Sequence, residues 1–335
     1  MDDMRGRVRA SLCALITTDE KGFRSALDAA FHKDVVVDMA YPVEQLVGRE
    51  ALAEAFLQPL RRAFDHARRR DELFLGGANT RADGGDWVAS VTHYVGRHSR
   101  RFLGAPPSDK LAFLRSGEFW RVEDGKICEG KVIFDLPDLM RQAGASPFPS
   151  ELGTEMLFPS PETHDGVCPE PSGGLDALNT VERMFAGLHR YDPVTFASID
   201  QVGPTGTWTD NFMWYGPSGI GSNTGWDGFV RDHRASFLRA FPDRAGGNHY
   251  CRISDGAYAA VSGWPSMTMT HRDTYLGIPP TGRPLTLRVM DFYRCEGPRI
   301  AENWVLLDYG DLYRQMGGDI FAPAQREVRE LETVR

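Results

Sequence analysis

The sequence contains two copies of one pattern, displaced by 173 positions, so that residues 103–144 align with residues 276–317 without a gap. The displacement also pairs Phe56 with Phe229, far upstream of that block. A register kept over most of the chain indicates a tandem duplication, so both copies are expected to fold into the same kind of unit. Identical pairs within the block include Pro106/Pro279, Arg115/Arg288, Phe119/Phe292, Asp135/Asp308 and Gln142/Gln315.

A proline-rich stretch separates the two copies. It contains six prolines with clustered Gly and Ser, which neither continue a helix nor enter the interior of a sheet. Its apolar cluster at 156–158 would be exposed on a free linker, so the stretch is expected to lie across both domains. The expected organisation is a first domain over 1–145, a linker over 146–174, a second domain over 175–320 and a tail over 321–335.

Each copy is expected to place its helices before its strands. In the second copy, apolar residues recur with the 3.6-residue period over 175–189 and 225–241, which predicts two amphipathic helices. Helices followed by hairpins indicate an α+β unit, and a short final helix is expected to end at Gly317. Four strand-like runs, separated by Gly and Pro, lie at 257–264, 267–277, 285–294 and 300–309.

Charge and composition exclude several classes of partner. Lys and Arg number 38 against 46 Asp and Glu, and the net charge of −8 argues against nucleic acid. The basic run at 66–72 is expected to be a solvated helix end, with an anion or partner patch as the alternative. No apolar stretch is long enough to span a membrane, so we expect no membrane partner and a cytoplasmic location. The five cysteines lack metal-ligand spacing, so neither a metal site nor a disulfide framework is expected.

Two motifs occur in both copies. One, beginning at His98 and His271, has the form His-x-x-x-aromatic-Leu-Gly-x-Pro-Pro-(Ser/Thr), and the other is a strand ending in Phe-aromatic-Arg at Arg121 and Arg294. With these motifs each copy resembles the SnoaL-like polyketide cyclase family of the nuclear transport factor 2-like superfamily. The resemblance implies two tandem cone-shaped α+β barrel domains, each a curved, mainly antiparallel sheet wrapped by helices around a pocket. It also implies that the copies pair sheet to sheet as an intramolecular pseudo-dimer, while further homo-oligomerisation stays open.

The resemblance further implies a ring closure that needs no cofactor and uses one carboxylic acid in the pocket. Aligned on the repeated motif, that acid falls at Val132 in the first copy and at Val305 in the second. The preceding strand nevertheless keeps a carboxylate in both copies, Glu118 and Asp291, flanked by apolar residues. Burying an unpaired carboxylate costs several kcal/mol, so each is expected either to pair with a structural Arg or His or to face a wet cavity.

The second copy is the better candidate for chemistry. Because side chains alternate along a strand, Asn303 faces the same side as position 305, whereas the matching position of the first copy is Gly130. His271, twenty residues before Asp291 and on the adjacent strand, and His233, on the second helix, are the proton carriers expected to work with Asp291. The alternative for His233 is an ordinary core or surface histidine.

Four aromatic residues before the second helix flank a glycine-rich segment at 216–225, and we expect them to bind substrate as a lid or pocket wall. Core packing is the alternative for each. They are Trp208, Trp214, Tyr215 and Trp226. In the first copy, Glu118 and His98 mark a secondary pocket whose remaining polar lining has been lost.

Two functions fit these patterns. The first is an enzyme without cofactor that uses acid/base chemistry on a small hydrophobic or aromatic carbonyl-type substrate, as a cyclase, isomerase, lyase or hydrolase. The second is a non-catalytic module of the same fold that binds a small ligand or serves assembly. Convergence of His271, Asp291 and Asn303 on one cavity would favour the first.

Overall fold

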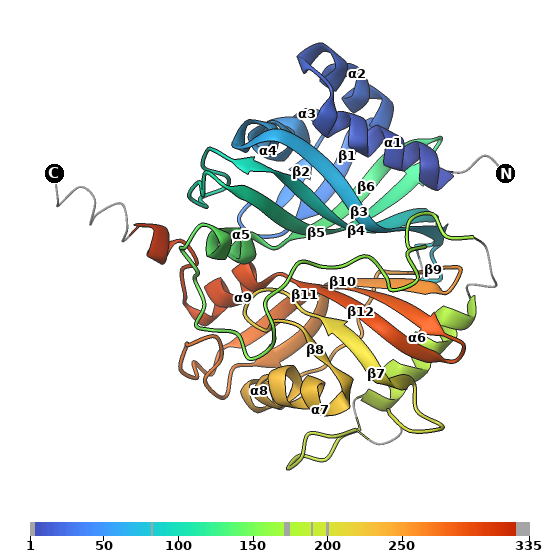
Figure 1. The fold of residues 1–335 in the computed structure, drawn as a ribbon, viewed down its shortest axis with the longest axis vertical. Coiled ribbons are helices and arrows are strands. Elements are labelled where there is room, and N and C mark those ends of the chain that lie inside the picture. Colours follow the sequence, from blue (N-terminus) through green and yellow to red (C-terminus); the bar gives the residue numbers. More distant parts are fainter. Residues whose placement is uncertain (1–3, 82, 171–174, 189, 199–200, 326–335) are drawn as a thin grey trace.

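The computed structural model describes residues 4–81, 83–170, 175–188, 190–198 and 201–325 (Figure 1). The first half contains α1 Met4–Thr17, α2 Glu20–Ala30, β1 Phe31–Met39, β2 Gln45–Val47, α3 Arg49–Leu52, the π-helix η1 Ala53–Leu57, α4 Gln58–Ala63, β3 Phe64–Ala78, β4 Asp86–His98, β5 Leu111–Glu123, β6 Lys126–Phe134 and α5 Leu136–Gln142. The second half contains α6 Leu175–Leu188, β7 Trp208–Tyr215, β8 Asn223–Thr224, α7 Gly225–Phe229, the π-helix η2 Val230–Arg234, α8 Ala235–Ala240, β9 Cys251–Asp255, β10 Tyr258–Thr270, β11 Pro284–Glu296, β12 Arg299–Leu307 and α9 Tyr309–Met316.

Each half builds a six-stranded sheet with the same strand order. The order is β2-β1-β6-β5-β4-β3 in the first sheet and β8-β7-β12-β11-β10-β9 in the second. One pair in each sheet is parallel, β1 with β6 and β7 with β12, and the other neighbours are antiparallel. The duplicated sequence therefore produces two tandem α+β domains of nuclear-transport-factor-2-like topology, as expected.

Three elements differ from the sequence expectation. The runs at 257–264 and 267–277 form the single strand β10, whose register shifts between Gly263 and Met267, and the chain turns after Thr270. The segment 208–215, expected to be part of a lid, is the strand β7. The basic run at 66–72 lies in β3 and is not a helix end. The expected tail at 321–335 lies mostly outside the described residues.

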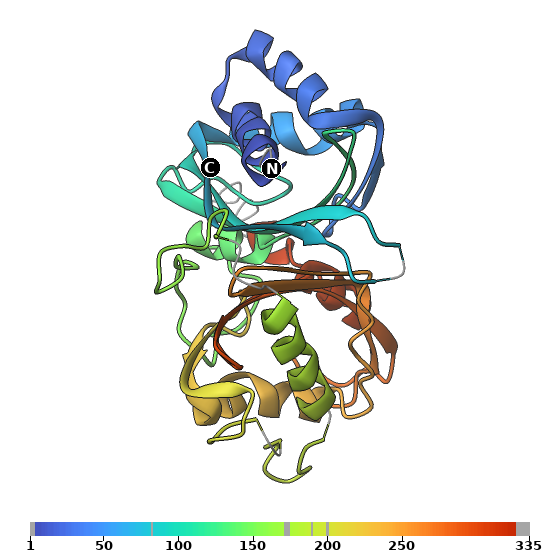
Figure 2. The same ribbon diagram turned by 90° about the vertical axis from the view of Figure 1, so that its right-hand side faces the viewer.

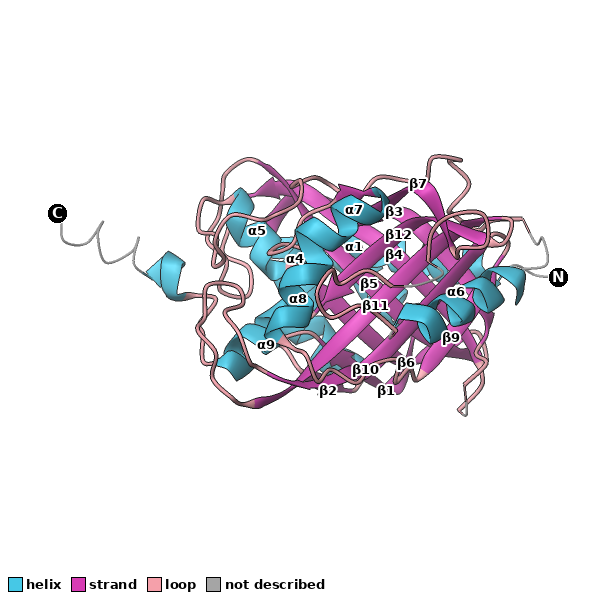
Figure 3. Cartoon of the chain, turned by 90° about the horizontal axis from the view of Figure 1, so that it is seen from below, coloured by secondary structure: helices cyan, strands magenta, loops and turns pink. Residues whose placement is uncertain are grey.

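The sheets form the centre of the molecule and the helices its two outer layers. Figures 1 and 2 show α1 to α4 over the outer face of the first sheet and α6 to α8 over that of the second, with the other faces of the sheets turned toward each other. Where these inner faces meet, the rings of Phe119 and Phe292 lie 5.5 Å apart. Figure 3 shows α5 and α9 together at one end of the layered sheets. Each sheet thus has one face for the other half and one face for its own helices.

The proline-rich segment between the halves contacts both sheets. Arg115 of β5 donates from Nη1 to the carbonyl oxygen of Met156 at 3.0 Å, and Trp304 of β12 donates from Nε1 to that of Pro159 at 3.0 Å. Between these two anchors, Phe158 is only 2% exposed. Burial of this ring explains why the segment follows the seam between the sheets and does not form a free loop.

Candidate active site in the second half

The second half encloses a cavity of about 100 Å³ between its sheet and its helices. The corresponding space in the first half is only about 10 Å³, roughly the room one water molecule needs. The larger cavity is mainly aromatic and aliphatic, with a few polar groups. Its walls are Met184, Phe185, Leu188, Trp208, Trp214, Phe229, His233, Phe237, Met267, Leu287, Val289, Asp291, Tyr293, Asn303, Val305 and Leu307.

Among the described residues, Asp291 is the only carboxylate on this wall. It lies on β11, where alternation turns Asp291 and Tyr293 toward the cavity and Phe292 toward the other half. Burial among apolar side chains raises the pKa of Asp291 to about 7, although hydrogen bonds from Asn303 and Tyr293 act in the opposite direction. The side chain remains partly exposed, as expected for a group that borders a cavity. Near neutral pH this carboxyl can therefore both accept and donate a proton.

Asp291 lies directly opposite Val305, the position where the family resemblance would place an acid. Asp291 and Val305 are direct partners across the antiparallel pair β11 and β12, and Glu118 and Val132 are partners in the same way in the first half. Side chains paired like this have their Cβ atoms about 5 Å apart. Asp291 thus reaches the same region of the cone from the neighbouring strand.

Asn303 lies on β12, on the cavity side, as strand alternation predicts. Its Nδ2 donates to the carbonyl oxygen of Phe292 at 3.0 Å, and its side chain also hydrogen-bonds to Asp291. The amide is therefore held in one orientation by the backbone of β11. It can present an adjacent polar contact to a molecule bound beside Asp291.

His233 lies on η2 and also lines the cavity. Its ring stacks on Trp214, with ring centroids 4.7 Å apart and an angle of 14° between the planes. Burial, together with the nearby charges of Arg234 and Arg244, lowers the pKa of His233 to about 3. The imidazole is neutral at physiological pH, and its Nδ1 is buried without a hydrogen-bond partner among the described residues.

His271 lies away from the cavity, so the expectation that it partners Asp291 does not hold. The residue opposite Asp291 on β10 is Val261, ten positions before His271, and the turn after Thr270 carries His271 beyond the end of the strand. There its Nδ1 is 3.1 Å from Oγ1 of Thr281, which belongs to the same repeated motif. The residue supports a turn at the sheet edge.

The aromatic residues before the second helix divide between two faces of β7. Trp208 and Trp214 face the cavity. Tyr215 faces the other side, where its hydroxyl donates to Oε1 of Glu302 at 2.9 Å. Trp226 is the second residue of α7, is outside the cavity wall, and lies below the guanidinium of Arg234, 5.7 Å from its ring centroid. Of the four aromatic residues expected to form a lid or pocket wall, the structure places Trp208 and Trp214 on the wall and Tyr215 and Trp226 outside it.

In the first half, the side chain of Glu118 is fully occupied by protein donors. Arg69 of β3 donates from Nη1 to both carboxylate oxygens at 2.9 and 2.7 Å, Tyr94 donates its hydroxyl at 2.7 Å, and Trp120 donates Nε1 at 2.9 Å. Arg69 also pairs with Asp71 at 2.8 Å. These contacts leave Glu118 a structural partner of Arg69.

His98 is also structural in this half. Its ring stacks on Phe64 at a centroid distance of 5.0 Å, and it is absent from the residues that line the first cone. Burial lowers its pKa. Neither His98 nor its repeat equivalent His271 therefore takes part in a cavity.

Among the polar residues of the cavity wall, the sequence expectations left out Tyr293. Tyr293 lies two positions after Asp291 on the same strand, so the alternation that selected Asn303 would also have selected Tyr293. In the first half, the sequence did not indicate that Arg69 pairs with Glu118, because Arg69 stands in a run of arginines.

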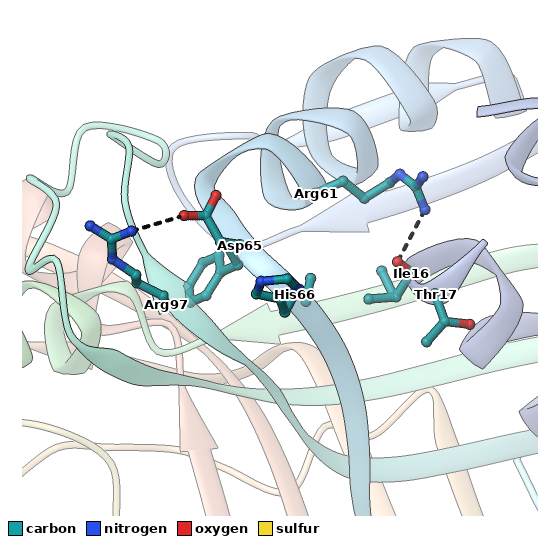
Figure 4. Close-up of a pocket in the computed structure, with 8 residues that line it drawn as sticks. Ile16, Thr17, Arg61, Asp65, His66 and Arg97 are labelled. Atoms are coloured by element: carbon teal, nitrogen blue, oxygen red, sulfur yellow. Dashed lines mark hydrogen bonds and ion pairs between the residues drawn. The ribbon is translucent and has the colours of Figure 1, made fainter. Parts of the chain in front are cut away.

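A second, more open pocket of about 480 Å³ lies at the edge of the first half (Figure 4). Figure 4 shows Arg61 directed at the carbonyl end of α1 and Arg97 directed at Asp65. Arg61 donates to the carbonyl oxygen of Leu15 at 2.7 Å, and Arg97 pairs with Asp65 at 3.6 Å and with Asp109 at 3.0 Å. Arg61 is hydrogen-bonded to backbone carbonyl oxygens and Arg97 is paired with two carboxylates, so this pocket offers less chemistry than the cavity around Asp291.

No group of His, Cys, Asp and Glu side chains among the described residues has the arrangement of a metal site. No helix in that part of the chain has the length and apolar character needed to cross a membrane.

Comparison with known proteins gives matches in both halves. The family model "SnoaL-like polyketide cyclase" matches residues 14–143 and 202–316. Among solved structures, the chain is similar to a SnoaL-like protein from Jannaschia sp. CCS1, at 18% identity over 43% of this chain and 96% of that one, with a TM-score of 0.34. Comparison with curated protein sequences gives no match.

Two proteins from Streptomyces give similar values. IdmH from Streptomyces antibioticus is 21% identical over 42% of this chain and 98% of its own length, with a TM-score of 0.35. TsrD from Streptomyces laurentii is 18% identical over 43% and 97%, with a TM-score of 0.34.

Proposed function

Because the chain belongs to the SnoaL-like polyketide cyclase family, we propose that its second half is an acid/base enzyme for a small hydrophobic or aromatic carbonyl compound. The observation that carries this proposal is Asp291, a carboxyl with a pKa of about 7 on the wall of an otherwise largely apolar cavity. A catalytic acid or base works best when its pKa lies near the working pH. The first half serves as a structural partner.

In this proposal Asp291 removes a proton from the carbon next to the substrate carbonyl and later returns it to the product. The carboxylate form accepts the proton, and the apolar surroundings that raise its pKa make it a stronger base than an exposed aspartate. Tyr293 and Asn303 hydrogen-bond to the carboxyl and hold it in place. Cyclisation, isomerisation and elimination can all begin with this step.

His233 acts in this scheme as a neutral hydrogen-bonding group. Its pKa of about 3 rules out a protonated imidazole near pH 7. The ring faces the cavity, is fixed against Trp214, and has an unpartnered Nδ1 that can contact the substrate oxygen. His271 has no place in the reaction.

The experiment follows exchange of the α-protons of 4-phenylbutan-2-one with D₂O by NMR, which tests the base without knowledge of the natural substrate. Asp291→Asn should slow the protein-catalysed exchange by about 10²–10⁴-fold, the usual contribution of a positioned base. The matched variant Glu118→Gln should leave the exchange rate within severalfold of the parent, although it weakens the ion pair with Arg69 and so lowers stability. Equal exchange by the parent and Asp291→Asn would refute the assignment.

A non-catalytic ligand-binding module is the second candidate, favoured by valine at both positions where the family resemblance places an acid. It predicts that 4-phenylbutan-2-one raises the melting temperature of the parent while no exchange above the solvent rate occurs. The same ligand titration on Asp291→Asn separates the two candidates. An enzyme should lose exchange and keep binding, whereas a module should show binding alone in both proteins.

A further inference from the structure

Two arginines lie together beside the cavity of the second half. Arg234 is the last residue of η2, directly after His233, and Arg244 follows α8. The two guanidinium groups lie close enough to repel each other, and both lower the pKa of His233. Tyr191 is their common neighbour, with its ring centroid 5.4 Å from the Arg234 guanidinium.

Arg234 has a structural task that its counterpart in the first half shares. It donates to the carbonyl oxygens of Leu188 at 2.8 Å and Phe196 at 2.7 Å. Arg61, 173 positions earlier, donates to the carbonyl oxygen of Leu15, also 173 positions before Leu188. Binding the end of the first helix is therefore a repeated feature of the fold.

Arg244 has no such task. Its Nε is buried without a hydrogen-bond partner, and no carboxylate among the described residues forms an ion pair with Arg234 or Arg244. Burial and the neighbouring Arg244 lower the pKa of Arg234 to about 10. In the first-half pocket, by contrast, the cation Arg97 has two carboxylate partners, Asp65 and Asp109.

Among the described residues neither cation has a carboxylate partner, although Arg234 also donates to Oγ of Ser198 at 2.6 Å. Neighbouring cations that are partly removed from water are costly, and an oxyanion would remove most of that cost through charge-assisted hydrogen bonds. We propose that Arg244, together with Arg234, binds a carboxylate or phosphate group carried by the substrate at the edge of the Asp291 cavity. Arg234 lies beside the cavity, because it donates to the carbonyl oxygen of Leu188 and Leu188 belongs to the cavity wall. An anionic group bound by Arg234 would therefore also lie beside the cavity.

This inference rests on the proposed function and narrows its substrate class. The apolar part of the substrate, with its carbonyl group, occupies the cone beside Asp291. An anionic end group remains outside the cone at Arg244. The wall of the cavity itself carries no Lys or Arg, so a neutral substrate would leave the two arginines unused.

The test compares two isosteric series at low ionic strength: ω-phenylalkanoates of increasing chain length and the matching methyl ketones, beginning with 3-phenylpropanoate and 4-phenylbutan-2-one. Calorimetry should show that the best acid binds the parent roughly tenfold or more tightly than its ketone. Arg244→Met should remove this preference and leave ketone affinity unchanged. Arg244→Lys keeps a charge and should retain part of the preference. Arg272→Met, at an exposed arginine after β10, should behave like the parent.

Inorganic phosphate distinguishes the two sources of an anion. If the group belongs to the substrate, phosphate should compete with the acids and leave ketone binding unchanged. If phosphate stabilises the parent through Arg244 while acids and ketones bind equally, the site takes a free anion and the substrate assignment is overturned. Equal binding of acid and ketone without any phosphate effect overturns the anion site itself. Failure of the ketones to bind at all would refute the proposed function of the cavity.

Discussion

At the scale of single residues, the carboxylates at one equivalent position of the two halves have different hydrogen-bond partners. Glu118 and Asp291 occupy equivalent places on β5 and β11, opposite Val132 and Val305. Glu118 accepts four hydrogen bonds, two of them from a buried arginine. Asp291 has only neutral partners, so burial dominates and its pKa rises. The two carboxylates therefore differ in whether a cation lies beside them.

The raised pKa of Asp291 predicts a pH dependence of stability. Between about pH 4, where an unfolded aspartate titrates, and pH 7, the folded chain holds the Asp291 proton more tightly than the unfolded chain. This group's contribution to the free energy of unfolding is therefore present at low pH and is lost as pH rises through that window. Asp291→Asn removes this loss, so its stability relative to the parent should increase from pH 4 to pH 7, by on the order of 1 kcal/mol per pH unit.

Urea unfolding of both proteins across this pH range measures the difference. The comparison also cancels other groups, including Asp308, whose pKa burial raises to about 7. If the difference in the free energy of unfolding between the two proteins did not vary with pH, the pKa of Asp291 would not be raised in the folded chain. That result would contradict the proposed role of Asp291 as an acid and base near neutral pH.

At the scale of elements, three residues that are identical in both halves fasten the final helix of each half to its sheet, and we call them the helix clamp. In the second half they are Arg288, Asp308 and Gln315. Asp308 caps α9 by accepting from the backbone N–H of Asp311 at 3.1 Å and pairs with Arg288 at 3.0 Å. Gln315 binds both backbone groups of Thr286, each at 2.9 Å. The equivalent residues of the first half, Asp135, Arg115 and Gln142, make the same contacts. These identities therefore preserve how the final helix is fastened to its sheet.

Asp308→Ala should lower the free energy of unfolding by about 2–4 kcal/mol at pH 8. The substitution removes the helix cap and leaves Arg288 without its buried partner, and each loss is destabilising. Asp135→Ala should cost a similar amount in the first half.

Denaturant unfolding monitored by tryptophan fluorescence gives these values. Asp86→Ala is the control, because Asp86 is exposed at the start of β4 and should change stability by less than about 0.5 kcal/mol. Loss of equal size in all three variants would show that the clamp has no special role.

At the scale of the whole molecule, each half completes the other. The backbone N–H of Tyr41 donates to Asp308 at 3.2 Å, and that of Ser218 donates to Asp135 at 2.9 Å. Such reciprocal contacts are typical of a two-fold interface. We therefore propose that the two halves form an intramolecular pseudo-dimer.

The shared interface predicts one cooperative unfolding transition for the whole chain. Gly117 shows how closely the sheets approach, since a Cβ atom there would lie 2.8 Å from Leu306 and 3.2 Å from Met290. Gly117→Leu should lower stability by about 1–3 kcal/mol through overpacking and reduce the cooperativity between the halves. The control Ala29→Leu also introduces a leucine, at an exposed position of α2, and should have little effect. Two separate calorimetric transitions in the parent would contradict this view.

Local sequence patterns were sufficient for several features. The repeat and the helical periodicities predicted two α+β units, because amphipathic spacing is set within each element. Strand alternation placed Asn303 on the side of Val305, which is the cavity side. The segment at 208–215 was not predicted to be a strand, because only its pairing with β12 distinguishes a strand from an irregular loop there.

The sequence by itself determined the duplication, the fold class and the cavity side for Asn303, since these depend on neighbours along the chain. Only the tertiary structure decided which charged groups meet. The pairing of Arg69 with Glu118 joins residues 49 positions apart, and the separation of His271 from Asp291 follows from a strand register and a turn. The Nε atom of Arg244, which has no hydrogen-bond partner among the described residues, likewise became visible only when its surroundings were known. Charge pairing depends on distances between elements, and no local period of the sequence records those distances.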